Sequence, residues 1–306
     1  MTDQSWEILS NQFVAVAGVL YFLALISILV EWASLRRLPA EEVVTTGRTA
    51  MFGRLGLILT GMAVVAHFVA LVGRGMAADP NRVPWGNMYE FTLTGTFVVA
   101  AGYLLLRGRH GLAWMAPIVV TFVLSLLMVD VIWLHEPVAP LTEALFSPWL
   151  VIHVVSAILA TGAFTLAGIC SALYLVKDRA RPRQTGYLAR VPSPAVLDRV
   201  SYRLHSFGFP IWTFAVLITG PIWAHQAWSS YWNWDPKEVW AFITWVVYAA
   251  YLHARSTAGW KGRNAAIVSL VALATLWFNF IGINYFSTSS QHSYAGAAHA
   301  FVEPDS

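Results

Sequence analysis

Eight blocks of mostly apolar residues, each about 20 residues long, limit what this 306-residue chain can fold into. A helix of about 20 residues crosses the roughly 30 Å hydrocarbon core of a bilayer. Charged residues make up only 11% of the chain, whereas about 25% is usual in a soluble domain. The sequence therefore predicts an all-α integral membrane protein, forming a single polytopic membrane domain over residues 1–306.

The predicted spanning helices follow the apolar blocks. We find no internal repeat, no low-complexity segment and no soluble domain, and the longest connection is the basic, proline-containing segment 177–204. The eight helices are expected near residues 12–32, 53–73, 88–106, 113–134, 149–176, 205–225, 237–255 and 265–286.

The basic residues predict the orientation of these helices. Three of the 19, Arg74, Arg82 and Lys237, fall on one side. The other sixteen fall in alternate connections, namely Arg36, Arg37, Arg48, Arg54, Arg107, Arg109, Lys177, Arg179, Arg181, Arg183, Arg190, Arg199, Arg203, Arg255, Lys261 and Arg263. Because basic connections stay in the cytoplasm, we expect both termini on the outer side. Their placement in short connections also argues against a nucleic-acid partner, although the net charge is +3.

The N-terminus and the cysteine content exclude two further classes. Residues 1–7 are acidic and lack the features of a cleaved secretory signal, so the first apolar block is expected to be a retained helix. Cys170 is the only cysteine and lies within an apolar block, where we expect it in the core. The chain therefore forms no internal disulfide, and without a C-x-x-C-H motif it is not itself a c-type cytochrome.

A tryptophan-rich segment at residues 223–245 is predicted to lie at the outer surface. It contains six of the fifteen tryptophans: Trp223, Trp228, Trp232, Trp234, Trp240 and Trp245. An aromatic belt at the lipid headgroups accounts for one or two tryptophans at a helix end, but not for three within the short stretch 228–234. Dense indole surface at a water boundary suits a large, flat, apolar ligand.

The Asp-Pro-Lys-Glu sequence inside this segment has a structural interpretation as well. Asp235 suits an N-cap, Pro236 the first helical position and Glu238 the third, which together predict a capping box. This role does not exclude contact with a ligand. Lys237 is the only basic residue in the segment and is a candidate partner for a ligand carboxylate.

These motifs resemble a known family. The segment 231–240, reading YWNWDPKEVW, looks like the WWD domain of haem-handling proteins, and the nearest resemblance is to cytochrome c biogenesis proteins of system II, the CcsA/ResC type also called CcsB. The segments 84–90, 149–153 and 291–294 resemble the family's outer-loop segment and its two histidine segments. Two departures are His225, where a small polar residue is usual, and Ser229-Ser230, where a glycine is usual.

The resemblance implies two haem b sites. At the outer site, His153 and His292 would supply the two axial ligands of the iron. At the inner site, His253 would bind a second haem together with a histidine of a partner subunit. The remaining residues expected at the outer haem are Trp228, Trp232, Trp234, Asp235, Lys237, Glu238, Trp240 and Trp245.

The remaining histidines are assigned structural positions. His67 is expected to be a packed polar residue. His110 and His205 are expected at the cytoplasmic boundary because basic residues surround them in the sequence. His135 and His299 fall in outer connections without a supporting pattern.

The implied function is that of the haem-handling subunit of a membrane cytochrome c synthase. Such a subunit moves haem to the outer face and presents it for thioether attachment to the C-x-x-C-H motif of an apocytochrome c, with no side chain acting as a catalytic acid or base. The implied partners are a ResB-type membrane subunit, apocytochromes c and thioredoxin-like thiol reductants. The implied location is the bacterial inner membrane or a thylakoid membrane.

Two alternatives remain open. An electron-transfer subunit of the di-haem cytochrome b kind would need paired histidines at matched depths, whereas His253 has no evident inner mate in this chain. A transporter of another flat ligand, or a haem exporter without synthase activity, would carry the same motifs. An absorption spectrum and a test of covalent haem attachment separate these functions.

Overall fold

The computed structural model describes residues 2–38, 46–139, 147–180, 185–287 and 290, and this part of the chain forms helices and no β-strand. Its contacts divide the chain into two compact units. Unit 1 comprises Met1–Pro140 and Pro182–Val191, and unit 2 comprises Leu141–Arg181 and Pro192–Ser306. The all-helical fold is confirmed, while the single polytopic domain stays a prediction.

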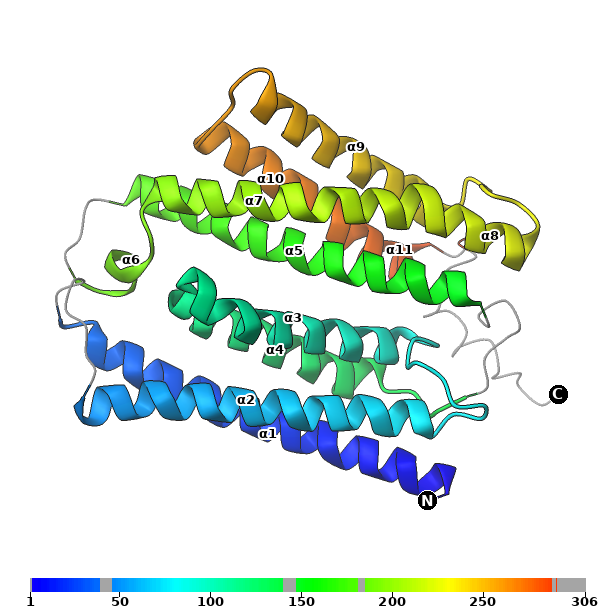
Figure 1. The fold of residues 1–306 in the computed structure, drawn as a ribbon, viewed down its shortest axis with the longest axis horizontal. Helices are drawn as coiled ribbons and strands as arrows, with labels where there is room; N and C mark the ends of the chain where they lie inside the picture. Colours follow the sequence, from blue (N-terminus) through cyan, green and yellow to red (C-terminus); the bar gives the residue numbers. More distant parts are fainter. Residues whose placement is uncertain (1, 39–45, 140–146, 181–184, 288–289, 291–306) are drawn as a thin grey trace. The chain divides into compact units, whose positions relative to one another are not determined.

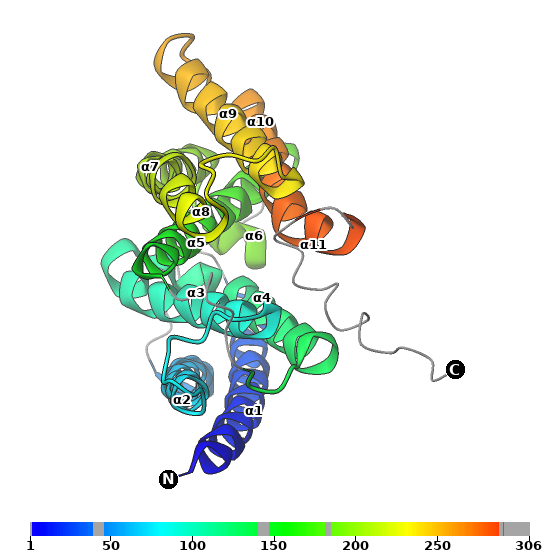
Figure 2. The same cartoon turned by 90° about the vertical axis from the view of Figure 1, so that its right-hand side faces the viewer.

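Unit 1 contains the first four predicted helices and a short fifth one (Figures 1 and 2). The fourth predicted helix is a succession of a 3-10, an α and a π segment. The elements are α1 (Asp3–Leu35), α2 (Gly47–Met76), α3 (Met88–His110), η1 (Leu112–Met115), α4 (Ala116–Val129), η2 (Asp130–Leu134) and α6 (Tyr187–Arg190).

Unit 2 contains the other four predicted helices, and α7 runs beside α5 within it (Figure 1). The long predicted connection 177–204 is shorter than expected, because α5 continues to Arg179 and α7 begins at Pro194. The elements are α5 (Pro148–Arg179), α7 (Pro194–Thr213), η4 (Phe214–Thr219), α8 (Gly220–Trp228), α9 (Pro236–Ser256), α10 (Arg263–Trp277), η5 (Phe278–Gly282) and α11 (Ile283–Phe286).

Seven of the eight long helical bodies in the described residues are long and apolar enough to cross a membrane, and α6 has only four residues. The exception is α9, which begins with Lys237 and Glu238 and ends with His253 and Arg255. Its tryptophans and tyrosines also score low on hydropathy, although such rings suit a membrane interface. The chain is a multi-pass membrane protein, and the eighth span remains a prediction.

Small residues let α1 and α2 pack closely in unit 1. A Cβ at Gly56 would lie 2.8 Å from Ile28 Cγ1, and one at Gly73 would lie 3.1 Å from the Trp6 carbonyl oxygen. The Ser10 hydroxyl donates a hydrogen bond of 2.8 Å to the Ala70 carbonyl. Such close backbone approach and interhelical hydrogen bonding hold helices together where lipid removes the hydrophobic driving force.

Buried charges join α2, α3 and their connection in unit 1. The fully buried Arg74 and Glu90 side chains form an ion pair, with 3.0 Å between Arg74 Nε and Glu90 Oε1. Arg82 Nη1 lies 2.5 Å from Glu90 Oε2, which also accepts the Gly86 N–H at 2.7 Å. Two of the three basic residues that departed from the cytoplasmic pattern are therefore neutralised inside the protein. Glu90 pairs with both of them, and Glu7 Oε1 lies 3.7 Å from Arg74 Nη1 as a second partner.

The core of unit 2 combines an aromatic cluster with a buried polar network. Phe164 of α5 stacks on Tyr248 of α9 with ring centroids 3.7 Å apart. Ser171 is 2.9 Å from both Ser201 and Ser269, and Ser269 Oγ lies 3.2 Å from His205 Nε2. Hydrogen bonds thus link α5, α7 and α10 in the interior.

This network corrects the prediction for His205. The residue is fully buried rather than at the cytoplasmic boundary, and its Nδ1 bonds to the Ser201 carbonyl at 2.7 Å. The surrounding arginines gave a misleading signal because they lie on other faces of α7. The expected core positions of Cys170 and His67 are confirmed: both are buried, and His67 Nε2 bonds to the Leu93 carbonyl at 2.9 Å.

Candidate functional site

His153 is placed by the start of α5. Ser147 caps this helix, its Oγ accepting the Trp149 N–H at 3.2 Å, and Pro148 occupies the first turn. The Ser147 hydroxyl also lies 2.7 Å from Gln226 Oε1 of α8. His153 therefore comes five residues after the start of α5, and Ser147 links this end of the helix to the end of α8 near the tryptophan-rich segment.

A hydrogen bond fixes the tautomer of His153. Its Nδ1 lies 2.9 Å from the carbonyl oxygen of Ala215 in the π-helical turn η4. A carbonyl only accepts, so Nδ1 carries the proton and a neutral ring has its lone pair on Nε2. Metal-binding histidines commonly donate their second nitrogen to a backbone carbonyl in this way.

The π-helical turn also brings the backbone at Gly220 close to the His153 ring. In this wide turn the Gly220 N–H bonds to the Ala215 carbonyl, and Pro221 has no N–H of its own to donate. A Cβ on Gly220 would lie 3.2 Å from both Cε1 and Nδ1 of His153. Gly220 thus leaves the space in which the ring lies.

His153 contacts the tryptophan-rich segment through Trp223, which in turn contacts Trp228. The His153 ring stacks on Trp223 with centroids 6.3 Å apart and planes 17° apart, and Trp223 meets Trp228 edge-on at 4.9 Å. Trp223 is buried and Trp228 half-buried. The structure therefore brings His153 and the start of the tryptophan-rich segment together in unit 2.

Two residues of this segment adopt left-handed backbone conformations. Ser229, where the family usually has a glycine nearby, ends α8 with φ 57°. Trp234 also has φ 57° and remains 78% exposed, an unusual combination for a large side chain. Backbone strain of this kind concentrates at binding sites. The departure from glycine is therefore accommodated without losing the turn.

The capping box predicted at the start of α9 is present. Asp235 Oδ1 accepts the Lys237 N–H at 2.8 Å, and Glu238 Oε2 accepts the Asp235 N–H at 3.2 Å. Ser290 adds a hydrogen bond of 2.8 Å to Asp235 Oδ1. The Lys237 Nζ donates to Asn284 Oδ1 at 2.7 Å. These contacts fix the start of α9 directly after Trp232 and the exposed Trp234.

Aromatic rings continue from the segment along α9. Trp232 meets Phe242 edge-on at 6.3 Å, Phe242 stacks on Trp245 at 5.8 Å, and Trp245 stacks on Phe209 of α7 at 5.7 Å. The Trp245 indole N–H donates to Thr213 Oγ1 at 2.9 Å. Trp240 points elsewhere, packing on Phe278 of η5 at 4.3 Å. The tryptophans expected at the outer haem therefore do not share one surface: Trp240 lies on a different face of α9 from Trp245.

Of the other predicted iron ligands, only His253 lies within the described residues, and the structure does not bring it to His153. His253 lies in the last turn of α9 with an exposed side chain, at the opposite end of the helix from the tryptophan-rich segment. His292 and His299 lie outside the described residues, and so do the side-chain contacts of His110. His225 is exposed and stacks on Tyr231 with centroids 4.2 Å apart, which supports the turn. Among the described residues, no group of three or more His, Cys, Asp or Glu side chains could hold a bare metal ion.

The donor set suits iron carried by a flat ring. The His153 imidazole, with its lone pair on Nε2, lies beside the Trp223 indole. Apolar ring surfaces of this kind bind a macrocycle, and one or two histidines hold the metal at its centre. Sequence analysis did not identify Ala215 and Gly220 as site residues. Ala215 contributes only its backbone carbonyl, and Gly220 contributes only the space left by its missing side chain. Only the pairing of Gly220 with Pro221 hinted at an irregular helix there.

Enlarging residue 220 is expected to displace the His153 ring in a graded way. A Gly220→Ala change requires a shift of a few tenths of an ångström, while Gly220→Val requires the ring to move. We expect a small loss of bound haem for the first and about a tenfold loss for the second, as for mutated supports of metal ligands. Haem content of the purified variants measures this, with Gly61→Ala as the control because nothing lies within 4 Å of its Cβ. Equal haem content in all three would refute the role of Gly220.

Comparison with known proteins identifies the class and then the family. The chain shares the fold of a cytochrome c haem lyase, CcmF, with a TM-score of 0.62, 16% identity, and coverage of 92% of this chain and 49% of that one. It thus has the fold of a class of polytopic helical membrane proteins. The family model described as cytochrome C assembly protein matches residues 85–290, and the chain belongs to this family.

Its relatives are of the CcsA type. The cytochrome c biogenesis protein CcsA of Chlamydomonas reinhardtii is 38% identical over 162 residues, covering 52% of this chain and 44% of the relative. The CcsA protein of Trieres chinensis is 28% identical over 325 residues, covering 94% of this chain and 98% of the relative. The chain thus spans less than half of the first relative and nearly all of the second. The predicted family is confirmed.

Proposed function

We propose that this chain is the haem-handling subunit of a membrane cytochrome c synthase. The observation that carries the proposal is the oriented His153 imidazole, with Nδ1 bonded to Ala215 and the ring joined through Trp223 to the tryptophan-rich segment. Membership of the cytochrome c assembly family supports the same role. His153 and His292 would hold the iron of haem b, and Trp228, Trp232 and the exposed Trp234 would contact the porphyrin.

The chain's own residues orient the ligand rather than react with it. Haem supplies vinyl groups to which the two thiols of a C-x-x-C-H motif add. Each S–H adds across a C=C bond, forming one S–C and one C–H bond with no net oxidation. Holding the ring in one position would make this addition effectively intramolecular. Cys170 is fully buried, so thiols must be kept reduced by partners of the thioredoxin-like kind.

His253 is proposed to serve an inner haem with a partner subunit. Its side chain is exposed at the end of α9, and a ResB-type membrane subunit would supply the second histidine there. The location would be a bacterial plasma membrane or a thylakoid membrane. A haem exporter without synthase activity remains the second candidate, since its site would need the same residues.

Co-expression with an apocytochrome tests the synthase proposal. Cells lacking their own cytochrome c assembly should produce a covalently haem-stained cytochrome only when this chain and its partner subunit are both present. A stained band without this chain would contradict the proposal. Free haem outside the cells without a stained band would favour the exporter.

The orientation and the eighth span are proposed together, and labelling at the two ends of α9 tests both. A Cys introduced at Asn233 is expected to react with a membrane-impermeant maleimide from outside, and one at Ala258 only from the cytoplasmic side. Both positions are exposed, while native Cys170 is buried and should give little background. Labelling of both positions from the same side would show that α9 does not span the bilayer.

A further inference from the structure

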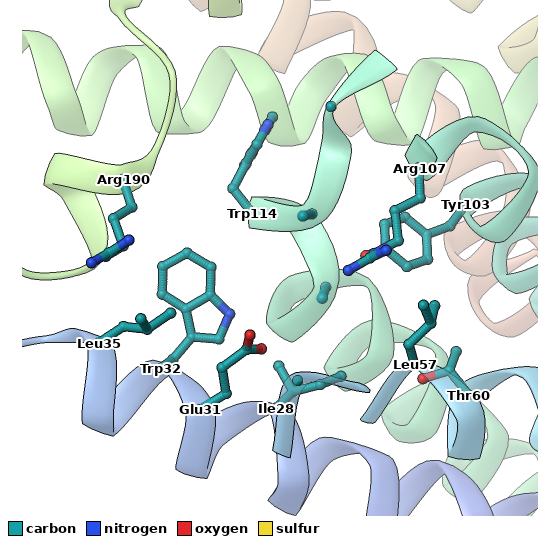
Figure 3. Close-up of a pocket in the computed structure, with 14 residues that line it drawn as sticks. Ile28, Glu31, Trp32, Leu35, Leu57, Thr60, Tyr103, Arg107, Trp114 and Arg190 are labelled. Carbon is teal, nitrogen blue, oxygen red and sulfur yellow. The ribbon is translucent and has the colours of Figure 1, made fainter. Parts of the chain in front are cut away.

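Unit 1 has a cavity of about 370 Å³ at the end where the predicted cytoplasmic connections lie. It is built by the last turns of α1 and α3, the first half of α2 and the start of the fourth helix, with α6 adding one side. The charged and aromatic side chains that line it are Glu31, Trp32, Tyr103, Arg107, Trp114 and Arg190 (Figure 3).

The segment between α5 and α7 contributes to this cavity. The Tyr187 hydroxyl donates a hydrogen bond of 3.2 Å to the Trp114 carbonyl, and its ring packs edge-on against Trp32 at 4.9 Å. These contacts hold α6 on unit 1, and its last residue, Arg190, lines the cavity. The cavity is therefore assembled from two distant parts of the chain.

Opposite charges line this space. Glu31, Arg107 and Arg190 all border the cavity, and in the described part of the chain Arg107 and Glu31 form no direct ion pair. The Glu31 carboxylate lies over Gly53, where a Cβ would come within 2.1 Å of Oε1. Two cationic groups and one anionic group thus surround a space that a ligand of mixed charge would fill.

The aromatic and apolar residues around the cavity indicate that its ligand is a lipid. Trp32 and Trp114 are typical of the headgroup level of a bilayer, and the half-exposed Leu57 brings an apolar side chain to the cavity edge. Basic pockets between membrane helices on the cytoplasmic side bind lipid headgroups. A porphyrin with two carboxylates would bring two negative charges to a cavity that already holds Glu31.

We infer that this cavity binds the zwitterionic phosphoethanolamine headgroup of a phospholipid in the cytoplasmic leaflet. The phosphate lies between Arg107 and Arg190, and the ammonium group donates to Glu31 beside the indole rings. The acyl chains leave along the apolar side of α2. This site is independent of the haem chemistry of unit 2.

Native mass spectrometry of the purified full-length protein tests the site. Phosphatidylethanolamine, phosphatidylcholine and phosphatidylglycerol are added in turn, with soluble O-phosphoethanolamine as a competitor without acyl chains. We expect phosphatidylethanolamine to bind several-fold more tightly than the other two lipids, and the soluble headgroup to compete only at much higher concentration. Equal competition by the soluble compound would mean that the site takes a free phosphate ester and not a lipid.

Variants assign the two ends of the headgroup. Arg107→Gln and Arg190→Gln should each weaken phosphatidylethanolamine binding about tenfold, the effect of one charged hydrogen bond. Glu31→Gln should remove the preference over phosphatidylglycerol, and Gly53→Ala should weaken binding by displacing the Glu31 carboxylate without changing any charge. Arg48→Gln, an exposed arginine at the same end of the unit, should have no effect.

Besides equal competition by the soluble headgroup, three results would overturn the inference. One is tighter binding of phosphatidylglycerol by the unchanged protein, and another is lipid binding that none of the cavity variants alters. The third is displacement of the lipid by added haem together with a lower haem affinity in Arg107→Gln, which would assign the cavity to haem.

Discussion

A Glu90→Ala variant is expected to lose about 3–5 kcal/mol of stability, the usual cost of removing one partner of a buried ion pair. Glu90 is the carboxylate that compensates two guanidinium groups, Arg74 and Arg82, and the Arg74 side chain is fully buried. Without Glu90, the buried Arg74 keeps only the more distant Glu7, whose Oε1 lies 3.7 Å from Arg74 Nη1, as a counter-charge. The Gly86 N–H also loses its acceptor.

Thermal unfolding in detergent measures this loss. Asp3→Ala is the matched control, because Asp3 is an exposed acid on the same unit. The double variant Glu90→Gln with Arg74→Gln should lose less than the sum of the two single changes, because the fully buried Arg74 charge is removed together with its partner and only Arg82 is left without Glu90. Unfolding of Glu90→Ala at the temperature of the unchanged protein would show that the pair contributes nothing.

His153→Ala and His292→Ala are each expected to abolish cytochrome c maturation and to lower bound haem about tenfold or more. The loss of a ligand should be at least as large as the loss caused by changing a residue that only supports a metal ligand. Two imidazoles on one iron give a low-spin haem, and removing either one opens a coordination position. The Nδ1 contact with Ala215 orients the first ligand. Added imidazole should restore part of the haem content by filling the vacated position.

The controls are other histidines of the same chain. His135→Ala should leave haem binding unchanged, since this exposed residue meets Tyr89 and Asn11 in unit 1. His225→Ala tests the site itself, because the residue is exposed within unit 2 and stacks on Tyr231. If His225→Ala removes the outer haem and His153→Ala leaves it intact, the ligand assignment is wrong.

The sequence predicted the helices well because lipid demands long apolar segments. It could not predict where buried charges go, since ion pairing depends on packing. Arg74 and Arg82 looked like exceptions on the outer side, and the structure shows that Glu90 neutralises both. His205 looked interfacial because arginines adjoin it in sequence, whereas its own helix face points to Ser269 in the core.

The candidate site was predicted in its residue types but not in its geometry. The capping box at Asp235 and Glu238 followed from local sequence rules and is present. The contact of His153 with Ala215 depends on the π-helical turn, and the space for its ring depends on Gly220. The roles of Ala215 and Gly220 cannot be found from the sequence. Every residue has a carbonyl, and the space beside a glycine matters only once the neighbouring side chain is known.

The two faces of α9 also became visible only in the structure. The sequence placed Trp232, Trp240 and Trp245 together among the residues expected at the outer haem, but Trp240 packs on Phe278 while Trp232 and Trp245 both approach Phe242. A helix turns by about 100° per residue, so neighbouring tryptophans in sequence diverge in space.

The absorption spectrum of the purified protein with its partner subunit tests most directly whether this chain holds haem through His153. We expect the unchanged protein to copurify with haem b that shows a low-spin, two-histidine spectrum. The His153→Ala variant, compared at equal protein concentration, should lose the outer-site component and regain it with imidazole. A protein that purifies without haem, or a His153→Ala spectrum identical to that of the unchanged protein, would contradict the proposed site.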